Sequence, residues 1–241
     1  MTEKAFIAGA TGYTGQNVVR VLAERKIAAV AHVRPDSASL DQWRKKFQSP
    51  GAEVDTTPWE ESALTETFAR LKAAIIFALL GTTRERMKAV AAHGQDPKSA
   101  DYEAVDYGLT AMLIRAATAA NISPRFVYLS AIGVKPGAAS PYYQARYKAE
   151  TELRDSGLPY TIARPSFISG PDREGRPTER LASSALDGVL SFAGALGAKK
   201  LRDRYLSLTG RELAGILVRL ALDPDAENQV FETDGLRQYL D

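Results

Sequence analysis

The sequence of 241 residues contains no cysteine and only two histidines, His32 and His93. Without cysteine the chain forms no disulfide, thiolate zinc site or iron–sulfur cluster, and it has no cysteine nucleophile. Two histidines are too few for a histidine-rich metal site, and a Ser-His-Asp triad would have to use one of the two. We therefore expect no metal centre.

Long hydrophobic runs and a clear excess of one charge are also missing. The longest apolar run, residues 73–80, is eight residues long, whereas a membrane-spanning helix needs about 20. Lys and Arg number 31 and Asp and Glu 29, which leaves a net charge of +2 and no basic imbalance of the kind that nucleic-acid binding requires. The sequence runs from Met1 directly into a strand-like stretch, with no signal-peptide pattern. We expect a cytoplasmic protein that binds neither membranes nor nucleic acid.

What the sequence does contain is an alternation of short apolar stretches and longer amphipathic ones. Apolar residues make up 45% and charged residues 25% of the chain, which is typical of a globular domain. We predict strands at residues 4–8, 28–33, 52–55, 73–79, 125–130 and 160–164. We predict helices at 14–25 and 102–120, from Ser140-Pro141 to Gly157, and after a capping box at Thr209 and Glu212. This alternation indicates βαβ units around a parallel sheet, in one α/β domain that spans residues 1–241.

About residues 165–205 interrupt the alternation after the sixth predicted strand. The segment is rich in Gly, Ser and Ala and includes a polar stretch at 171–177. Ligands of open α/β sheets bind beyond the carboxyl ends of the strands, so the segment is placed to cover a small-molecule substrate. A surface loop without that role is the alternative, and the sequence favours neither.

A glycine-rich turn, Gly9-Ala-Thr-Gly12-Tyr-Thr-Gly15, connects the first predicted strand to the first predicted helix. In dinucleotide-binding proteins the first glycine allows a tight turn, the second lets backbone N–H groups approach a pyrophosphate, and the third allows close helix–strand packing. The phosphates then lie at the positive end of the helix dipole. The turn has the strand before it and the helix after it, and we predict dinucleotide binding.

The turn resembles the fingerprint of atypical and extended short-chain dehydrogenases, particularly the NmrA-like, isoflavone-reductase-like and Tat-interacting-protein-30-like branch. Further segments resemble this family in the same order: Val33-Arg-Pro35, Leu80-Gly-Thr-Thr-Arg84, the stretch 102–117, Ser156 through Pro165, and Arg211-Glu-Leu-Ala214. The resemblance covers nearly the whole chain. It implies a Rossmann-type, doubly wound parallel sheet with a small substrate-side region towards the C-terminus, and a nicotinamide cofactor.

From these motifs and this resemblance we expect a set of cofactor-binding residues. They are Gly9, Thr11, Gly12, Tyr13, Thr14, Gly15, Arg34, Ser37, Leu79, Leu80, Gly81, Thr82, Ser130, Lys148, Pro165 and Phe167.

The end of the second predicted strand bears on the choice between NAD and NADP. NAD-binding versions place an acidic residue there to hold the ribose 2′-OH, but the sequence reads His32-Val-Arg34-Pro and has no acid before Asp36. Arg34, with Ser37, offers charge-assisted hydrogen bonds to a 2′-phosphate. We predict NADP rather than NAD, although a solvated arginine at a strand end is the plain alternative and Asp36 argues against NADP.

The catalytic pattern of the family is incomplete in this chain. Typical members use a serine together with Tyr-x-x-x-Lys, whose i, i+4 spacing puts the tyrosine and the lysine on one helix face. Lys148 aligns with the lysine, but Gln144 stands in the tyrosine position and Ala131 in the position of the second serine of a Ser-Ser pair that Ser130 begins. The isoflavone-reductase-like branch also lacks the tyrosine and relies on a lysine of this helix, which makes Lys148 the candidate for proton transfer.

Two alternatives accompany this assignment. Tyr143 is a second candidate only if a local bulge brings it into line, and Lys148 has a plain structural role if it pairs with Glu152. Asp101, Glu103 and Asp106 are expected to form a helix cap and a solvated helix face rather than a pair of catalytic carboxylates.

Three functions are consistent with the sequence. The first is an NADP(H)-dependent oxidoreductase acting on a small carbonyl, quinone or conjugated substrate. The second is a non-catalytic NmrA-like protein that senses nucleotides, which the missing serine and tyrosine favour. The third, a sugar-nucleotide epimerase or dehydratase, is the weakest because that chemistry also needs the missing tyrosine.

Overall fold

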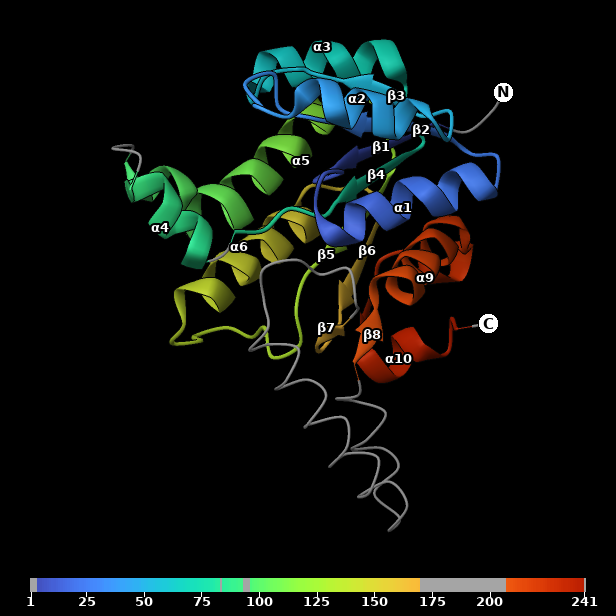
Figure 1. The fold of residues 1–241 in the computed structure, drawn as a ribbon. Coiled ribbons are helices and arrows are strands. Elements are labelled where there is room, and N and C mark those ends of the chain that lie inside the picture. Colours follow the sequence, from blue (N-terminus) through green and yellow to red (C-terminus); the bar gives the residue numbers. More distant parts are fainter. Residues whose placement is uncertain (1–3, 83, 93–95, 170–206, 241) are drawn as a thin grey trace.

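A seven-stranded, fully parallel sheet in the order β3-β2-β1-β4-β5-β6-β9 forms the centre of the molecule (Figure 1). It is seen in a computed structural model that describes residues 4–82, 84–92, 96–169 and 207–240. The strands are β1 (Lys4–Ala8), β2 (Ala28–His32), β3 (Glu53–Asp55), β4 (Ile75–Ala78), β5 (Arg125–Leu129), β6 (Tyr160–Arg164) and β9 (Gln229–Glu232). The predicted Rossmann-type, doubly wound fold is thereby confirmed.

Helices cover both faces of the sheet (Figure 1). One layer contains α1 (Tyr13–Glu24), α2 (Leu40–Gln48) and α9 (Gly210–Leu222), and the other contains α3 (Glu61–Leu71), α5 (Leu109–Ala119) and α6 (Pro141–Asp155). The remaining described elements are α4 (Arg84–Ala92), η1 (Pro97–Ala100), η2 (Tyr102–Gly108), η3 (Pro224–Ala226) and α10 (Thr233–Arg237).

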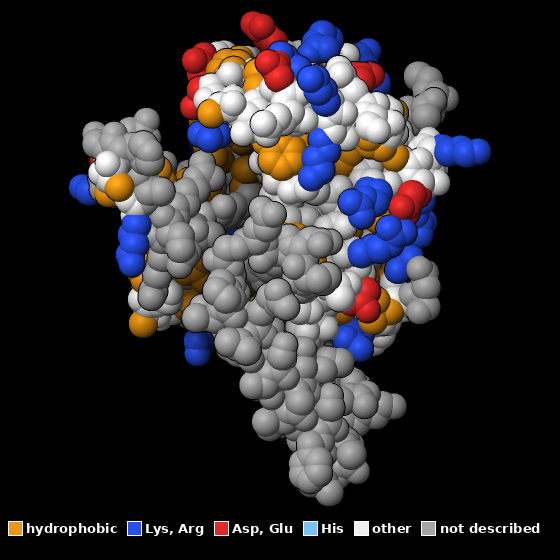
Figure 2. Space-filling model, in the orientation of Figure 1, with side chains coloured by type: hydrophobic (Ala, Val, Ile, Leu, Met, Phe, Trp, Pro, Cys, Tyr) orange, Lys and Arg blue, Asp and Glu red, His pale blue; other side chains and the backbone are white. Residues whose placement is uncertain are grey.

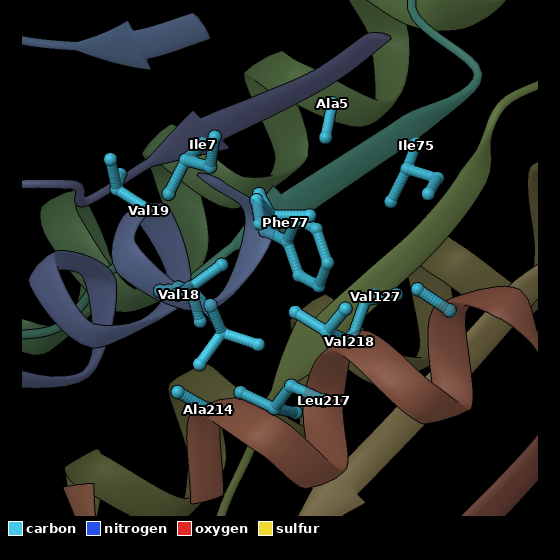
Figure 3. Close-up of a cluster of buried hydrophobic side chains, with 14 of the residues drawn as sticks. Ala5, Ile7, Val18, Val19, Ile75, Phe77, Val127, Ala214, Leu217 and Val218 are labelled. Atoms are coloured by element: carbon cyan, nitrogen blue, oxygen red, sulfur yellow. The ribbon is translucent and has the colours of Figure 1, made fainter. Parts of the chain in front are cut away.

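Alternation along the strands divides the core between these layers. In β1, Ile7 faces the α1 and α9 side whereas Phe6 faces the α3, α5 and α6 side, as the period of two in a strand requires. Figure 3 shows Ile7 and Phe77 of the sheet near Val18 of α1 and Leu217 of α9. The helix that follows the glycine-rich turn is thus held between the sheet and α9.

The strand order reverses between β1 and β4. β1 pairs with β2 on one edge and with β4 on the other, so the connections that leave the carboxyl ends of β1 and β4 diverge to opposite layers. In open α/β sheets such a switch point forms the crevice in which ligands bind. The glycine-rich turn lies at this switch point.

The six predicted strands are all present, with ends within two residues of the expected positions. The predicted helix over 102–120 consists of two elements. The π-helix η2 ends at Gly108, and the α-helix α5 begins at the next residue, Leu109. The seventh strand, β9, escaped prediction because it is a short edge strand whose first two residues are exposed, so it has little apolar alternation.

The expected substrate-side segment falls largely outside the described residues. Its two ends are described: Ile168–Ser169 (β7) pairs in parallel with Leu208–Thr209 (β8). Residues 170–206 lie outside the description, as does His93.

No helix in the described ranges is long and apolar enough to cross a membrane. Figure 2 shows Lys and Arg side chains interspersed with Asp and Glu over the top of the molecule, where α2 and α3 lie.

Candidate functional site

In the glycine-rich turn, backbone atoms approach one another more closely than side chains would allow. Gly9 has a φ of +83°, and a Cβ on it would lie 2.6 Å from the carbonyl oxygen of Leu79 at the end of β4. A Cβ on Gly15 would overlap the carbonyl oxygen of Gly9. Only glycine therefore lets α1 start this close to β1 and β4.

Gly12 is the N-cap of α1, and its N–H donates to the Gly9 carbonyl at 3.0 Å. The first turn of an α-helix leaves backbone N–H groups unpaired, and Gly12 has no side chain with which to cap them. A Cβ at this position would lie 3.2 Å from the Gly9 oxygen. The turn is therefore open towards the N-terminus of α1, the place where a pyrophosphate binds.

The other residues of the turn have structural partners. The Thr11 carbonyl accepts a hydrogen bond from Gln16 Nε2 at 2.8 Å, and Thr14 is buried. Tyr13 donates from its hydroxyl to the Ser169 carbonyl at 3.2 Å, and its ring fills the space where Gly210 would otherwise carry a Cβ. Tyr13 thus connects the turn to β7 and to the start of α9.

The residues that leave β4 lie beside the turn. Leu79 N–H donates to the Ala8 carbonyl at 3.0 Å, and Leu80 is partly buried. Thr82 is held at its N–H by Asp106 Oδ2, at 2.9 Å, and at its hydroxyl by the Ala100 carbonyl, at 2.8 Å. The expected cofactor residues of the β1 and β4 ends are therefore brought together at the switch point.

Arg34 lies two residues beyond the end of β2. Its side chain is 48% exposed, and its Nη1 is 3.6 Å from Asp36 Oδ2. The Ser37 N–H donates to the Arg34 carbonyl at 3.1 Å, which closes a turn. The guanidinium is accessible, and its ion pair with Asp36 is long.

Ser130 is committed to a buried ion cluster. Its hydroxyl donates to Oε1 of Glu150, which is fully buried, at 2.6 Å. The same carboxylate accepts two hydrogen bonds from Arg164, at 2.9 and 2.6 Å, and one from Arg154 at 2.8 Å. Ser130 therefore contributes to the support of α6 on β5 and β6.

Pro165 and Phe167, expected near the cofactor, follow β6. The Pro165 carbonyl accepts a hydrogen bond from the Ile132 N–H at 3.0 Å, and the Phe167 carbonyl accepts one from the Leu208 N–H at 3.0 Å. The Phe167 side chain is 45% exposed.

Lys148 and Gln144 lie on the outer face of α6. The Lys148 side chain is 52% exposed and makes an ion pair with Glu103, at 2.6 Å between Nζ and Oε1. Its expected alternative partner, Glu152, instead accepts from Arg115 at 2.9 Å. The exposed Gln144 donates from Nε2 to the Ala138 carbonyl at 2.9 Å. The structure thus does not join Lys148 or Gln144 to Ser130.

The inner face of α6 carries a different pair, Tyr142 and Arg146, at the same i, i+4 spacing. Arg146 is buried, and its guanidinium donates to the carbonyl of Leu129 at 2.5 Å and to Asp106 Oδ1 at 2.8 Å. Its guanidinium carbon lies 4.8 Å from the centroid of the Tyr142 ring. Sequence reasoning missed this pair, although Ala145, Ala149 and Leu153 mark the buried face to which it belongs.

Asp106 corrects an expectation. It was expected on a solvated helix face, but its side chain is completely buried and bridges Thr82 and Arg146. Asp101 does cap η2, because its carboxylate accepts from the Ala104 N–H at 2.8 Å. The wide turn of η2 places Asp106 towards the sheet rather than towards solvent.

Tyr143, the second catalytic candidate, lies next to this pair. Its ring centroid is 5.1 Å from that of Tyr142, and its ring lies 3.8 Å from where Gly133 would carry a Cβ. No bulge occurs in α6, so Tyr143 and Lys148 do not share a face.

A parallel sheet whose first strand passes through three close-packed glycines into a helix is the architecture of Rossmann-type dinucleotide-binding proteins. A family model described as NAD(P)H-binding matches residues 9–189. The chain belongs to this NAD(P)H-binding family, which confirms the resemblance to atypical short-chain dehydrogenases.

Relatives support this membership. Protein fmp52-1, mitochondrial, of Aspergillus terreus is 31% identical over 196 residues, which are 78% of this chain and 75% of that protein. Protein TIC 62, chloroplastic, of Arabidopsis thaliana is 28% identical over 208 residues, which are 78% of this chain and 31% of that protein.

Solved structures share the fold. The oxidoreductase ylbE from Lactococcus lactis has a TM-score of 0.58 at 20% identity, covering 94% of this chain and 88% of its own. UDP-glucose 4-epimerase from Thermotoga maritima has a TM-score of 0.61 at 15% identity, covering 98% and 82%. At these identities the likeness concerns the fold alone.

Proposed function

We propose that this protein is an NADP(H)-dependent oxidoreductase that acts on a small carbonyl, quinone or conjugated substrate. The observation that carries the proposal is the open N-terminus of α1 at Gly12, at the switch point between β1 and β4. Membership of the NAD(P)H-binding family supports the nicotinamide cofactor. The choice of NADP and the class of substrate go beyond that membership and belong to the proposal.

The residues around the turn fit a dinucleotide. Gly9, Gly12 and Gly15 leave room for a pyrophosphate against unpaired backbone N–H groups, and the β4 exit from Leu79 to Thr82 continues the same edge of the sheet. A bound nicotinamide dinucleotide supplies or accepts a hydride. The protein's part is to bind the phosphates, orient the ring and deliver a proton to the substrate oxygen.

The exposed guanidinium of Arg34 supports the choice of NADP. A 2′-phosphate would replace Asp36 as its partner, and an exposed ion pair such as Arg34–Asp36 is worth at most about 1 kcal/mol. Asp36 itself is available to hold a ribose hydroxyl, so Arg34 and Asp36 together decide between the two coenzymes.

Substrate, partners and location belong to the same proposal. We propose that the protein acts on a small-molecule substrate in the cytoplasm and has no nucleic-acid or membrane partner. The near balance of charges, 31 basic against 29 acidic residues, supports the partner assignment. Two relatives are named as mitochondrial and chloroplastic. Fractionation of the source cells tests the proposed location.

A nucleotide-sensing protein without turnover, of the NmrA-like kind, is the second candidate. The observation that favours it is that Ala131, at the position of the catalytic serine, has no hydroxyl, while the hydroxyl of the neighbouring Ser130 is bonded to Glu150. Incubation with NADPH and a panel of quinones, aldehydes and enones separates the two candidates: oxidation of NADPH at 340 nm identifies an oxidoreductase, and binding without oxidation identifies a sensor.

Gly12→Val tests the coenzyme site. The backbone at Gly12 has φ −73° and ψ 164°, a region that valine adopts, and a Cβ there requires the Gly9 oxygen, 3.2 Å away, to shift by only a few tenths of an ångström, so the fold should persist. The branched side chain should close the open end of α1 and abolish NADPH binding in calorimetry, with an unchanged near-ultraviolet dichroism spectrum as the control for folding. Unchanged NADPH affinity would contradict the proposed site.

Arg34→Ala tests the coenzyme preference. Loss of a hydrogen bond to a charged group should weaken NADPH binding by about 1.5–3 kcal/mol and leave NADH binding nearly unchanged. Arg44→Ala is a matched control, because Arg44 is an exposed arginine of α2 that also pairs with an aspartate, at 3.3 Å from Asp41. Equal losses for both coenzymes in Arg34→Ala would mean that Arg34 does not recognise the 2′-phosphate.

A further inference from the structure

Charged side chains are divided unequally between the two helix layers. Helices α1, α2 and α9 carry six basic residues, Arg20, Arg44, Lys45, Lys46, Arg211 and Arg219, and three acidic ones, Glu24, Asp41 and Glu212. Helices α3, α5 and α6 of the other layer carry five residues of each sign. Arg25 and Lys26, which follow α1 directly, add to the excess. One layer is therefore basic, although the whole chain has a net charge of only +2.

The basic residues of the two layers also differ in their partners. On the α3, α5 and α6 layer each of the five forms an ion pair with a carboxylate. On the basic layer Arg44 pairs with Asp41, and Arg211 pairs with Glu24. The exposed residues here that form no ion pair within the described part of the chain are Arg20, Arg25, Lys26 and Lys45. Their charges are available to a partner from outside.

A groove of about 410 Å³ lies between α1 and α9, within this basic layer. Figure 1 shows the two helices side by side, and Figure 2 shows Lys and Arg side chains gathered towards the right of the molecule, where these helices lie. Arg25, Arg211 and Arg219 line the groove together with Glu24 and Glu212. Both carboxylates already accept hydrogen bonds, Glu24 from Arg211 and Glu212 from the N-cap of α9. The groove therefore favours an anionic ligand.

Part of the groove lining carries no charge. Val21, Gly215 and Leu240 contribute to it. A Cβ on Gly215 would lie 3.4 Å from Nη2 of Arg219, so the guanidinium extends over the glycine. Because Gly215 has no side chain, the space beside α9 stays open. The groove can thus hold an aliphatic side chain between charged groups.

We propose that this groove binds an acidic peptide segment of a partner protein. Carboxylates of such a segment match the planar guanidinium group with paired hydrogen bonds, and an aliphatic side chain would lie against Val21 and Leu240. The unpaired Arg20 and Lys26 adjoin the lining residues in sequence and would attract acidic residues outside the groove. The proposal goes beyond the proposed function, because the groove adjoins the last turn of α1 whereas the coenzyme turn precedes the first.

Two other polyanions fit the same groove less well. A nucleic acid carries a charge on every phosphate, and Glu24 and Glu212 would repel it inside the groove. Binding at a bilayer surface combines basic residues with an apolar face. Within the described ranges, Leu222 at the end of α9 is the only exposed large hydrophobic side chain of these three helices. A peptide can instead place acidic and aliphatic side chains in the order that the lining requires.

Fluorescence anisotropy tests this binding with the full chain. The probe is a short fluorescein-labelled peptide of Glu and Leu, and the same peptide with Gln in place of Glu is its control. We expect the Glu peptide to bind at low ionic strength and to weaken as salt screens the exposed charges, whereas the Gln peptide should not bind. Absence of binding by the Glu peptide at low ionic strength would overturn the proposal.

Arg25→Glu tests the contribution of the groove's charge. The variant replaces an attraction by a repulsion at an exposed residue and should weaken the Glu peptide by about three- to twentyfold. Lys72→Glu is the matched control, because Lys72 is an exposed lysine at the C-cap of α3, on the other layer, and the change in net charge is the same. Equal weakening in both variants would mean that net charge alone attracts the peptide and would overturn the groove as its site.

Gly215→Leu tests the groove without a change of charge. Leucine has a higher helix propensity than glycine, and the nearest atoms to a Cβ there belong to the flexible end of Arg219, so the fold should persist. The new side chain should fill the groove and weaken the Glu peptide at least about tenfold, because the peptide would have to displace it. Unchanged binding would place the peptide on the open surface and contradict the proposed site.

Two further probes decide the class of partner. Single-stranded DNA and vesicles of phosphatidylserine and phosphatidylcholine should each bind more weakly than the Glu peptide at the same concentration of negative charge. Tighter binding of either one would overturn the acidic peptide in favour of a nucleic acid or a membrane. Calorimetry should give one Kd for NADPH in the wild type, Arg25→Glu and Gly215→Leu, so that failure of peptide binding and failure of the proposed function are separate results.

Discussion

Three buried titratable residues, Glu150, Asp106 and His32, sit at or near the carboxyl edge of the sheet, and each has a partner. Glu150 is surrounded by two arginines and a serine, and Asp106 by Arg146 and the Thr82 N–H. His32 is in its neutral form, and its partner is a backbone carbonyl rather than a charged group. A carbonyl can only accept, so the 2.8 Å contact between His32 Nε2 and the Thr57 oxygen means that Nε2 carries the hydrogen.

His32 should make the stability of the protein depend on pH. Burial lowers the pKa of His32 below its ordinary value of 6.5, against opposing contributions from the Thr57 carbonyl and Asp55. The unfolded chain then binds a proton near pH 6.5 while the folded chain does not, so stability is complete above that pH and falls as the pH drops below it. Urea unfolding between pH 7.5 and 5.5 should show this decline.

His32→Gln supplies the control for this prediction. Glutamine retains a donor for the Thr57 carbonyl but does not titrate, so this variant should lose less stability than the wild type between pH 7.5 and 5.5. An identical decline in the two proteins would show that His32 is not its source.

Some residue-level features were predictable and others were not. The turn was predictable from its three glycines, because this spacing between a strand and a helix is what the backbone of a dinucleotide-binding turn requires. The burial of Arg146 rather than Lys148 was not predicted, because two residues rotate a helix by about 200° and the family pattern gave no check on the face. The small residues Ala145 and Ala149 provided that check, since they point to the sheet.

At the scale of elements, the two predicted N-caps differ in strength. Thr209 forms a complete capping box, accepting at its hydroxyl from the Glu212 N–H at 3.2 Å while its own N–H donates to Glu212 Oε2 at 2.7 Å. Ser140 stands at the N-cap of α6, but its side chain makes no capping bond. Proline at the first position of α6 already fixes the backbone there.

Thr209→Ala should therefore destabilise the protein by about 1 kcal/mol, the usual cost of a lost N-cap. Ser140→Ala, the matched control at the other predicted cap, should change the free energy of unfolding by less than about 0.5 kcal/mol. Chemical denaturation of both variants measures the difference. Equal effects would mean that the capping box of α9 contributes nothing beyond its sequence pattern.

The π-helix is an element that periodicity did not reveal. Val105 and Leu109 have the four-residue spacing of an ordinary helix, so the apolar pattern over 102–120 indicates one continuous helix. Within the wider winding of η2, Asp106 makes tertiary contacts with Thr82 and Arg146. Such contacts join residues 24 and 40 positions apart, which lies beyond any local signal.

At the scale of the whole molecule, β9 forms one edge of the sheet and connects the C-terminal segment to it. It pairs with β6 from Thr161 to Arg164. Arg125, at the start of β5, donates to Glu227 Oε2 at 2.9 Å and to the Asp223 carbonyl at 3.1 Å. The C-terminal segment that contains β9 therefore contacts both β6 and β5.

Removal of residues 224–241 should cost at least about 5 kcal/mol, because it exposes the edge of β6 and removes the fully buried Leu236 along with Phe231. A loss of that size corresponds to a fall in Tm of about 10–20 °C for a chain of this length. Val230→Thr, at a side chain that is 36% exposed, is the control and should leave Tm nearly unchanged. A truncated chain with the Tm of the full protein would show that β9 is dispensable.

The packing of α1 between the sheet and α9 has a consequence for synthesis of the chain. α9 covers α1 through Leu217 and its neighbours (Figure 3), yet about 200 residues separate Glu24 from Leu222, and at roughly 5–20 residues per second the ribosome needs about 10–40 s to make them. During that interval the part of α1 that α9 covers in the folded protein is exposed and available to chaperones.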